Sequence, residues 1–149
     1  MKIAICGDHR GYRLKEDLKE KIISKLGYEC LDFGTFSEEM CDFPPLAFKV
    51  GECVSKGEAD YGVVICGSGD GVCIASNKVK GIRCTITLNS SDAYRAKAHV
   101  NANVIALGSE KTDLLEAIKI VKTLVETEFL ECRYKKRIEM ISDYENGHE

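Results

Sequence analysis

Hydrophobic positions along the chain alternate between short continuous runs and segments with helical spacing. Between the first two runs, leucine or isoleucine recurs at every fourth position from Leu14 to Leu26, and Gly27 follows as a C-terminal cap. The pattern predicts buried strands separated by amphipathic helices. The continuous runs, which are apolar or β-branched and of strand length, are residues 2–6, 28–32, 61–66, 82–86 and 103–107.

Further helices are predicted in the segments after the second, third, fourth and fifth runs. Pro44 and Pro45 are typical of a first helical turn, and Leu46, Val50 and Val54 then share one face. Short helices are expected at about residues 71–79 and 90–99. A long helix follows from Leu114 to Val125, with Thr112 or Asp113 as its N-cap.

This alternation is typical of βαβ units with right-handed crossovers. It predicts an α/β, Rossmann-like fold: an open, parallel, five-stranded sheet with helices on both faces. The segment "ECRYKKRIEMISDYE" adds an extra C-terminal helix with Tyr134, Ile138 and Ile141 on its apolar side. Because no strand follows this helix, we expect it to dock against a second subunit.

Composition restricts the function classes. The chain has 149 residues, 44% hydrophobic and 30% charged, without a linker-like segment, so one domain over residues 1–149 is expected. The short apolar run near Met1 and the lack of an 18-residue apolar span favour a cytoplasmic protein that does not contact a membrane. A net charge of −3 disfavours nucleic acid as a partner.

The cysteine pattern indicates reduced thiols. The chain has 8 cysteines, and without a secretion signal we expect no disulfides. None of them forms a C-x-x-C pair, so no metal site is predicted. Most of these cysteines are expected to be small core residues.

Ligands of open α/β sheets bind beyond the carboxyl ends of the strands, and the loop "CGSGDG" lies at such a place. Gly67, Gly69 and Gly71 let the backbone approach a ligand, and the next helix presents free N–H groups there. The loop is not a dinucleotide fingerprint, because Val72 stands where the third glycine belongs, and no Gly-Lys-Ser/Thr follows as in a P-loop. An anion cradle and a plain tight turn both fit.

Cys66 strengthens the functional interpretation of this loop. A thiol that ends a strand and faces a helix N-terminus is expected to ionise readily, which makes it a usable base or nucleophile. A buried, inert thiol is the alternative, and it is the reading we adopt for Cys6, Cys73 and Cys84.

Other candidate residues lie in further loops and in the last helix. Asp8 and His9 follow the first strand, which we expect to neighbour the third, so both groups can converge on the Cys66 crevice. His99 is either a functional group or a helix-capping residue. Arg133 and Arg137, spaced i, i+4, form either a phosphate clamp or a solvated basic face.

With these residues in view, the chain resembles the ribose-5-phosphate isomerase B family, which includes the subunits of galactose-6-phosphate isomerase. The resemblance covers nearly the whole chain and is carried by "KIAICGDHRGYRLKEDL", "YECLDFGT", "VVICGSGDGVCIASNKVKGIR" and "CRYKKRIEMI". It implies an aldose–ketose isomerase of a sugar phosphate that needs no cofactor. In the family the pocket forms between two subunits, which implies a homodimer or a homotetramer.

The resemblance also assigns roles to individual residues. Cys66 matches the base that moves a proton between C1 and C2, and His99 matches the acid that opens the sugar ring. The enediolate is held, in the family, by groups that match the Ser68 hydroxyl and the backbone of Gly67, Ser68, Gly69, Asp70 and Gly71. Contacts to the sugar and its phosphate are matched by Asp8, His9, Arg133 and Arg137.

Three positions depart from the family pattern. Val100 and Glu110 replace a usual asparagine and arginine, and Phe43 stands where tyrosine is common. Glu110 repels a nearby phosphate unless a basic neighbour such as Lys111 compensates. The departures favour either ribose 5-phosphate with weakened turnover or another pentose or hexose phosphate such as galactose 6-phosphate.

Two alternatives from other classes stay open. A non-catalytic sugar-phosphate binding protein would keep the fold and the arginines. A thiol redox sensor based on Cys66 would need a resolving cysteine, and Cys73 is expected to lie too far away or on the wrong face.

Overall fold

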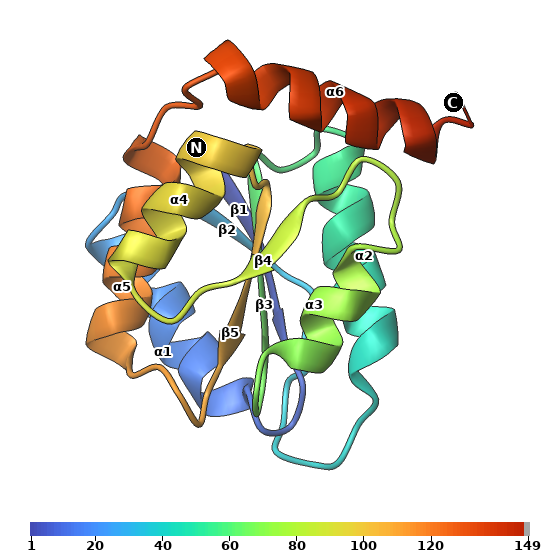
Figure 1. The fold of residues 1–149 in the computed structure, drawn as a ribbon. Coiled ribbons are helices and arrows are strands. Elements are labelled where there is room, and N and C mark those ends of the chain that lie inside the picture. Colours follow the sequence, from blue (N-terminus) through green and yellow to red (C-terminus); the bar gives the residue numbers. More distant parts are fainter. Residues whose placement is uncertain (148–149) are drawn as a thin grey trace.

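The computed structural model describes residues 1–147, and it contains a five-stranded parallel sheet in the order β2-β1-β3-β5-β4 (Figure 1). The strands are β1 (Lys2–Gly7), β2 (Glu29–Asp32), β3 (Tyr61–Cys66), β4 (Cys84–Ile86) and β5 (Val104–Gly108). The helices are α1 (Tyr12–Ser24), α2 (Phe43–Ser55), α3 (Asp70–Ser76), α4 (Ser90–Val100), α5 (Leu114–Glu126) and α6 (Cys132–Glu145).

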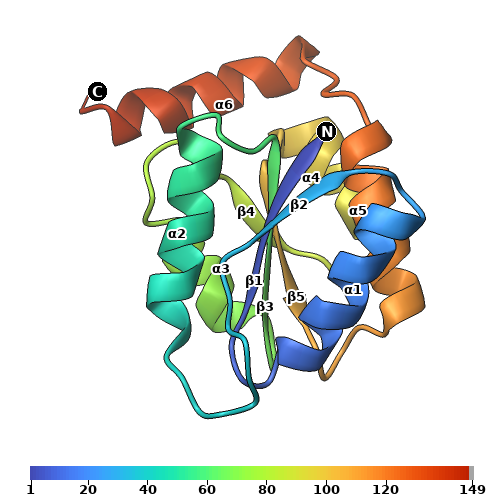
Figure 2. The same cartoon turned by 180° about the vertical axis from the view of Figure 1, so that it is seen from behind.

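Helices cover both faces of the sheet, as Figures 1 and 2 show from opposite sides. α2 and α3 pack together on one face, whereas α5 contacts both α1 and α4 on the other. Alternate residues of β1 point to the two faces: Ala4 and Cys6 join the core beneath α2, and Ile3 and Ile5 join the core beneath α1. The central strands are therefore apolar on both sides, which explains their continuous hydrophobic runs.

The predicted α/β fold class is confirmed, including helices on both faces and the additional C-terminal helix. The element ends differ by a few residues. α3 ends at Ser76, before the expected residue 79, because the Asn77 side chain bonds the backbone of Cys84 through both its Nδ2 and its Oδ1, at 2.9 and 2.8 Å. α5 has Asp113 as its N-cap, and this carboxylate accepts from the Glu116 N–H at 2.9 Å.

The order of the strands creates a crevice at the carboxyl ends of β1 and β3. β1 pairs with β2 on one side and, as expected from the sequence, with β3 on the other. The connection after β1 leads to α1 and the connection after β3 leads to α3, on opposite faces of the sheet. The two loops diverge at this point, which is where ligands of such sheets bind.

α6 crosses the other end of the sheet, beside the N-terminus of the chain (Figures 1 and 2). No residue of α6 is buried, and Met140, Ile141 and Tyr144 are 61%, 55% and 84% exposed. Apolar side chains this exposed indicate a surface for contact with another molecule. The docking of α6 against a second subunit stays a prediction.

A buried ion-pair network fastens α1 to the end of β2. The fully buried Lys15 Nζ lies 2.7 Å from Asp32 Oδ2 and 2.6 Å from Glu16 Oε1, and Lys19 Nζ also lies 2.7 Å from Asp32 Oδ2. Burial acts to raise the pKa of Asp32, but the hydrogen bonds from Lys15 and Lys19 outweigh it, so the pKa is lowered overall.

We expect Asp32→Asn to reduce the free energy of unfolding by about 3 kcal/mol at pH 7, because it leaves a buried ammonium without its main partner. Since the folded pKa of Asp32 is lowered, its contribution is present above the unfolded pKa of about 4 and is lost as the pH falls below it. Urea unfolding of both proteins from pH 7 to pH 3 measures this difference.

Asp17→Asn is the matched control, because Asp17 is an exposed carboxylate on the same helix. Its effect is expected to stay within about 0.5 kcal/mol. A difference between the native protein and Asp32→Asn that is constant down to the acid end of the series would contradict the role given to this carboxylate.

Within residues 1–147, no helix is both long enough and apolar enough to cross a membrane. The same part of the chain has no group of three or more His, Cys, Asp or Glu side chains arranged to hold a metal ion.

Candidate active site

Cys66 is the last residue of β3 and pairs with Gly108, the last residue of β5. Gly69, with φ of +87°, turns the chain back toward the strand it has just left. Its N–H donates to Cys66 Sγ at 3.1 Å. The sulfur therefore lies against a backbone donor at the start of the loop.

The loop after Cys66 presents donors to the space beside the sulfur. The Asp70 N–H donates to Ser68 Oγ at 3.2 Å, which fixes that hydroxyl within the loop. Within the described residues, the N–H groups of Ser68 and Gly71 meet no acceptor. Unpaired backbone donors just before a helix and in its first turn favour an anionic ligand.

Asp8 and His9 reach the same crevice from the loop after β1. The Asp8 carboxylate is only 6% exposed, and its Oδ1 accepts from the N–H groups of Arg10 and Gly11 at 2.9 and 3.0 Å. His9 Nδ1 lies 3.3 Å from both the N–H and the carbonyl oxygen of Cys41, so whether it accepts or donates follows its tautomer, and in either case Nε2 of the ring is left for a ligand. Both side chains are thus oriented by the backbone around them.

These groups surround one open hollow of about 340 Å³. Of the residues predicted from the sequence, the hollow brings together Asp8, His9, Cys66, Gly67, Ser68 and Gly71, while Gly69 and Asp70 lie in the same loop. The hollow is also lined by Arg10, Phe43 and Glu110.

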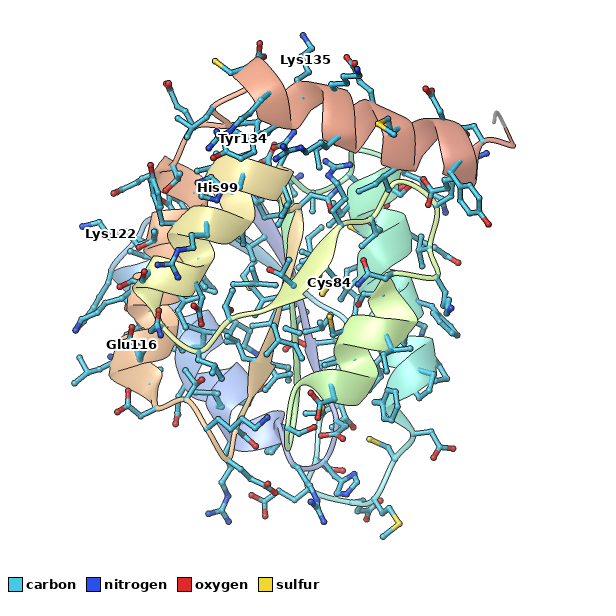
Figure 3. All side chains as sticks on the ribbon, in the orientation of Figure 1. Cys84, His99, Glu116, Lys122, Tyr134 and Lys135 are labelled. Carbon is cyan, nitrogen blue, oxygen red and sulfur yellow. The ribbon has the colours of Figure 1, made fainter. Side chains whose placement is uncertain are left out.

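A second cluster forms where α4 meets α6 (Figure 3). The rings of His99 and Tyr134 are stacked, with centroids 4.6 Å apart and planes inclined by 10°. Arg133 Nη2 donates to the Tyr134 hydroxyl at 3.1 Å, and Arg137 Cζ lies 6.0 Å from the same ring. The structure therefore groups His99, Arg133 and Arg137 around one tyrosine.

The two clusters lie at opposite ends of the sheet. Cys66 is at the carboxyl end of β3, whereas His99 is in the last turn of α4, just before the amino end of β5. The 5 residues of β5 alone span roughly 13 Å. In Figure 3 His99 and Tyr134 lie at the upper end of the molecule, away from the lower loops that follow β1 and β3. A single chain does not bring its Cys66 and its His99 together.

Sequence reasoning missed two contributors to these clusters, Arg10 and Tyr134, and named a third, Phe43, only as a departure from the family pattern. Arg10 follows His9 directly, a signal that could have drawn attention to it. Phe43 lies so close over Gly71 that a Cβ there would be 2.5 Å from the ring. Tyr134 was expected only as part of an apolar face, although its place between the predicted arginines hinted at contact with both.

Glu110 has a basic partner that is not its neighbour in the sequence. A basic residue such as Lys111 was one way in which its charge could be offset, and Glu110 Oε1 instead lies 3.1 Å from Nη1 of Arg10. The two residues are a hundred positions apart in the chain, so no local pattern could reveal the pair.

Cys6 and Cys73, two of the other thiols named above, lie outside the hollow and are held by burial or by contacts with β4. Burial raises the pKa of Cys6, which is fully buried. Cys73 Sγ donates to the Cys84 carbonyl at 3.4 Å, and a side-chain hydrogen bond with Cys84 lowers the pKa of Cys73. The Cys73 sulfur is therefore bonded to β4 and not to Cys66, so its contacts do not support a redox couple between the two thiols.

Comparison with known proteins gives the family. The family described as Ribose/Galactose Isomerase matches residues 3–141, so the chain belongs to the ribose/galactose isomerases and is an aldose–ketose isomerase. Several of its relatives carry the name ribose-5-phosphate isomerase B, and one from Bacillus subtilis, 39% identical over 97% of both chains, is named a putative sugar phosphate isomerase. The Escherichia coli ribose-5-phosphate isomerase B is 36% identical, over 97% of this chain and 96% of its own.

Two solved structures carry the same fold. The ribose-5-phosphate isomerase B of Clostridium thermocellum superposes with a TM-score of 0.94 at 43% identity, covering 99% of both chains. The Mycoplasma genitalium enzyme, whose structure contains ribulose-5-phosphate, has a TM-score of 0.91 at 37% identity, covering 97% of this chain and 96% of its own.

Proposed function

We propose that the protein interconverts ribose 5-phosphate and ribulose 5-phosphate through a cis-enediolate, with Cys66 as the base. The single observation that carries this proposal is the Cys66 sulfur beside unpaired N–H donors in a hollow also lined by Asp8 and His9. Relatives with the same fold carry the name of this activity, and one of them binds ribulose-5-phosphate.

The chemistry requires a base and an anion cradle at adjacent atoms. Removal of a proton from the carbon next to a carbonyl places negative charge on the carbonyl oxygen. The N–H groups of Ser68 and Gly71 and the Ser68 hydroxyl stabilise this oxygen, and each such donor contributes about 10²-fold or more to the rate. The same sulfur then returns a proton to the former carbonyl carbon, while the proton of the neighbouring hydroxyl passes to the former carbonyl oxygen and a new carbonyl forms. The electron pair stays on the substrate, so no redox cofactor is needed, and the thiol proton exchanges in part with water before it is returned.

The other half of the site comes from a second copy of the chain. His99, Arg133 and Arg137 suit a ring-opening acid and a phosphate grip, but they lie at the far end of the sheet from Cys66 of their own chain. A homodimer, or a homotetramer built from dimers, places these groups over the partner's hollow. The exposed apolar side chains of α6 supply a surface for such a contact.

The test is an assay of the purified protein against pentose and hexose phosphates in deuterated water. We expect turnover of ribose 5-phosphate with deuterium at the carbon next to the carbonyl. Preferred turnover of galactose 6-phosphate would keep the isomerase reaction but change its substrate. This sugar phosphate is included because Phe43 and Val100 depart from the family pattern. Binding of sugar phosphates without any exchange would instead make the chain a binding protein.

A further inference from the structure

Arg10 places a positive charge at the mouth of the Cys66 hollow. Among the described residues that line this hollow, it carries the only permanent positive charge. The arginines of α6 belong to the opposite end of the chain. The Arg10 guanidinium is therefore the permanent positive charge that this half of the site offers to an anionic group.

The Arg10 backbone is held by hydrogen bonds, whereas its exposed side chain is held by one exposed ion pair. The N–H groups of Arg10 and Gly11 both donate to the Asp8 carboxylate, which is only 6% exposed. The Arg10 side chain is 64% exposed, and its Nη1 donates to Glu110 Oε1 at 3.1 Å, where Glu110 is 61% exposed. Because exposed ion pairs contribute little to folding stability, this contact can be exchanged for another.

The ion pair lies directly over the residue that follows Cys66. A Cβ at Gly67 would be 3.1 Å from Arg10 Cδ and 3.1 Å from Glu110 Oε1. Glycine at this position lets the two side chains cross the loop at van der Waals distance. The guanidinium is thereby held beside the groups that surround the substrate.

We propose that Arg10 binds the phosphate group of the substrate, and that Glu110 holds the Arg10 guanidinium over the empty hollow until phosphate replaces it. The proposal rests on the proposed function for the identity of the ligand. A dianionic phosphate forms paired, charge-assisted hydrogen bonds with a guanidinium, which makes it a stronger partner than one exposed carboxylate. In this chain, Glu110 thus competes with phosphate for the Arg10 guanidinium and lowers the affinity for phosphate.

The two members of the pair should therefore respond in opposite directions. We expect Arg10→Gln to weaken the binding of inorganic phosphate, measured by calorimetry, by about tenfold. Its KM for ribose 5-phosphate should rise by a similar factor, with kcat changed by less than about twofold. Glu110→Gln should tighten phosphate binding by about threefold, because it frees the guanidinium and removes a negative charge.

Arg13→Gln is the matched control, because Arg13 also forms an exposed ion pair, with Glu38, and neither residue lines the hollow. It should change neither phosphate binding nor KM. The exchanged variant Arg10→Glu/Glu110→Arg restores a guanidinium over Gly67 and should bind phosphate within about fivefold of the native protein.

A pair with only a structural role would make both single substitutions act alike. Weaker phosphate binding in Glu110→Gln, unchanged binding in Arg10→Gln, or no phosphate binding by the native protein overturns the proposal. Turnover of ribose 5-phosphate tests the proposed function separately, since phosphate binding is measured without catalysis.

Discussion

Cys66→Ala is expected to lower kcat for ribose 5-phosphate by about a thousandfold while KM changes little. The sulfur is the group placed to take the proton, and alanine leaves no other ionisable atom at the end of β3. The neighbouring N–H donors and the Asp8–His9 loop do not depend on the sulfur, so substrate binding should persist. Steady-state kinetics and deuterium incorporation measure the two effects separately.

Cys53→Ala is the control for loss of a buried thiol. Cys53 is 3% exposed on α2 and Cys66 is 6% exposed, so both substitutions remove a similarly buried sulfur. Cys53 does not line the hollow, and its variant should keep native kcat once unfolding is allowed for. Deuterium exchange that survives in Cys66→Ala at the native rate would assign the base to another residue.

The sequence predicted the layout of the fold because the relevant forces are local and periodic. Continuous apolar runs such as residues 61–66 arise where a strand is covered on both faces, and the four-residue spacing from Leu14 arises where a helix covers one. The ends were less certain, because a side chain such as Asn77 can end a helix through a contact with Cys84, which is distant in the sequence.

The loops around Cys66 could be predicted for a related reason. The carboxyl ends of β1 and β3 are neighbours in the sheet, so the residues after each strand meet without any long-range information beyond strand order. Pairs that depend on side-chain reach were not predictable in this way. The contact between Arg10 and Glu110 joins the first and the fifth loop, and no spacing rule connects those positions.

The proposed division of the site between two chains was also beyond residue patterns. His99 and Arg137 carry the right chemistry, and the resemblance alone implied that they act across a subunit boundary. The structure adds a physical reason: the length of the sheet separates them from Cys66 of the same chain. This separation leads to the second large effect that we expect.

Two inactive variants should restore activity when they are mixed. Cys66→Ala lacks the base, and Arg133→Ala/Arg137→Ala lacks the phosphate grip, with a loss of kcat/KM of about a thousandfold. After unfolding and refolding together, half of the dimers are mixed, and each mixed dimer contains one site with both halves intact. We expect about a quarter of the native activity at substrate concentrations below KM. Size-exclusion chromatography of each sample checks that the refolded chains have assembled.

The control mixture combines Cys66→Ala with Asp8→Asn. Each of these changes falls in the hollow of its own chain, so neither chain of a mixed dimer has an intact hollow. Every site in those mixed dimers keeps one defect, so the mixture should gain nothing over its parts. If His99 and the arginines acted on the sulfur of their own chain, both mixtures would stay inactive. Recovery in the first mixture alone requires that the hollow of one copy and the Tyr134 cluster of the other work on a single substrate molecule.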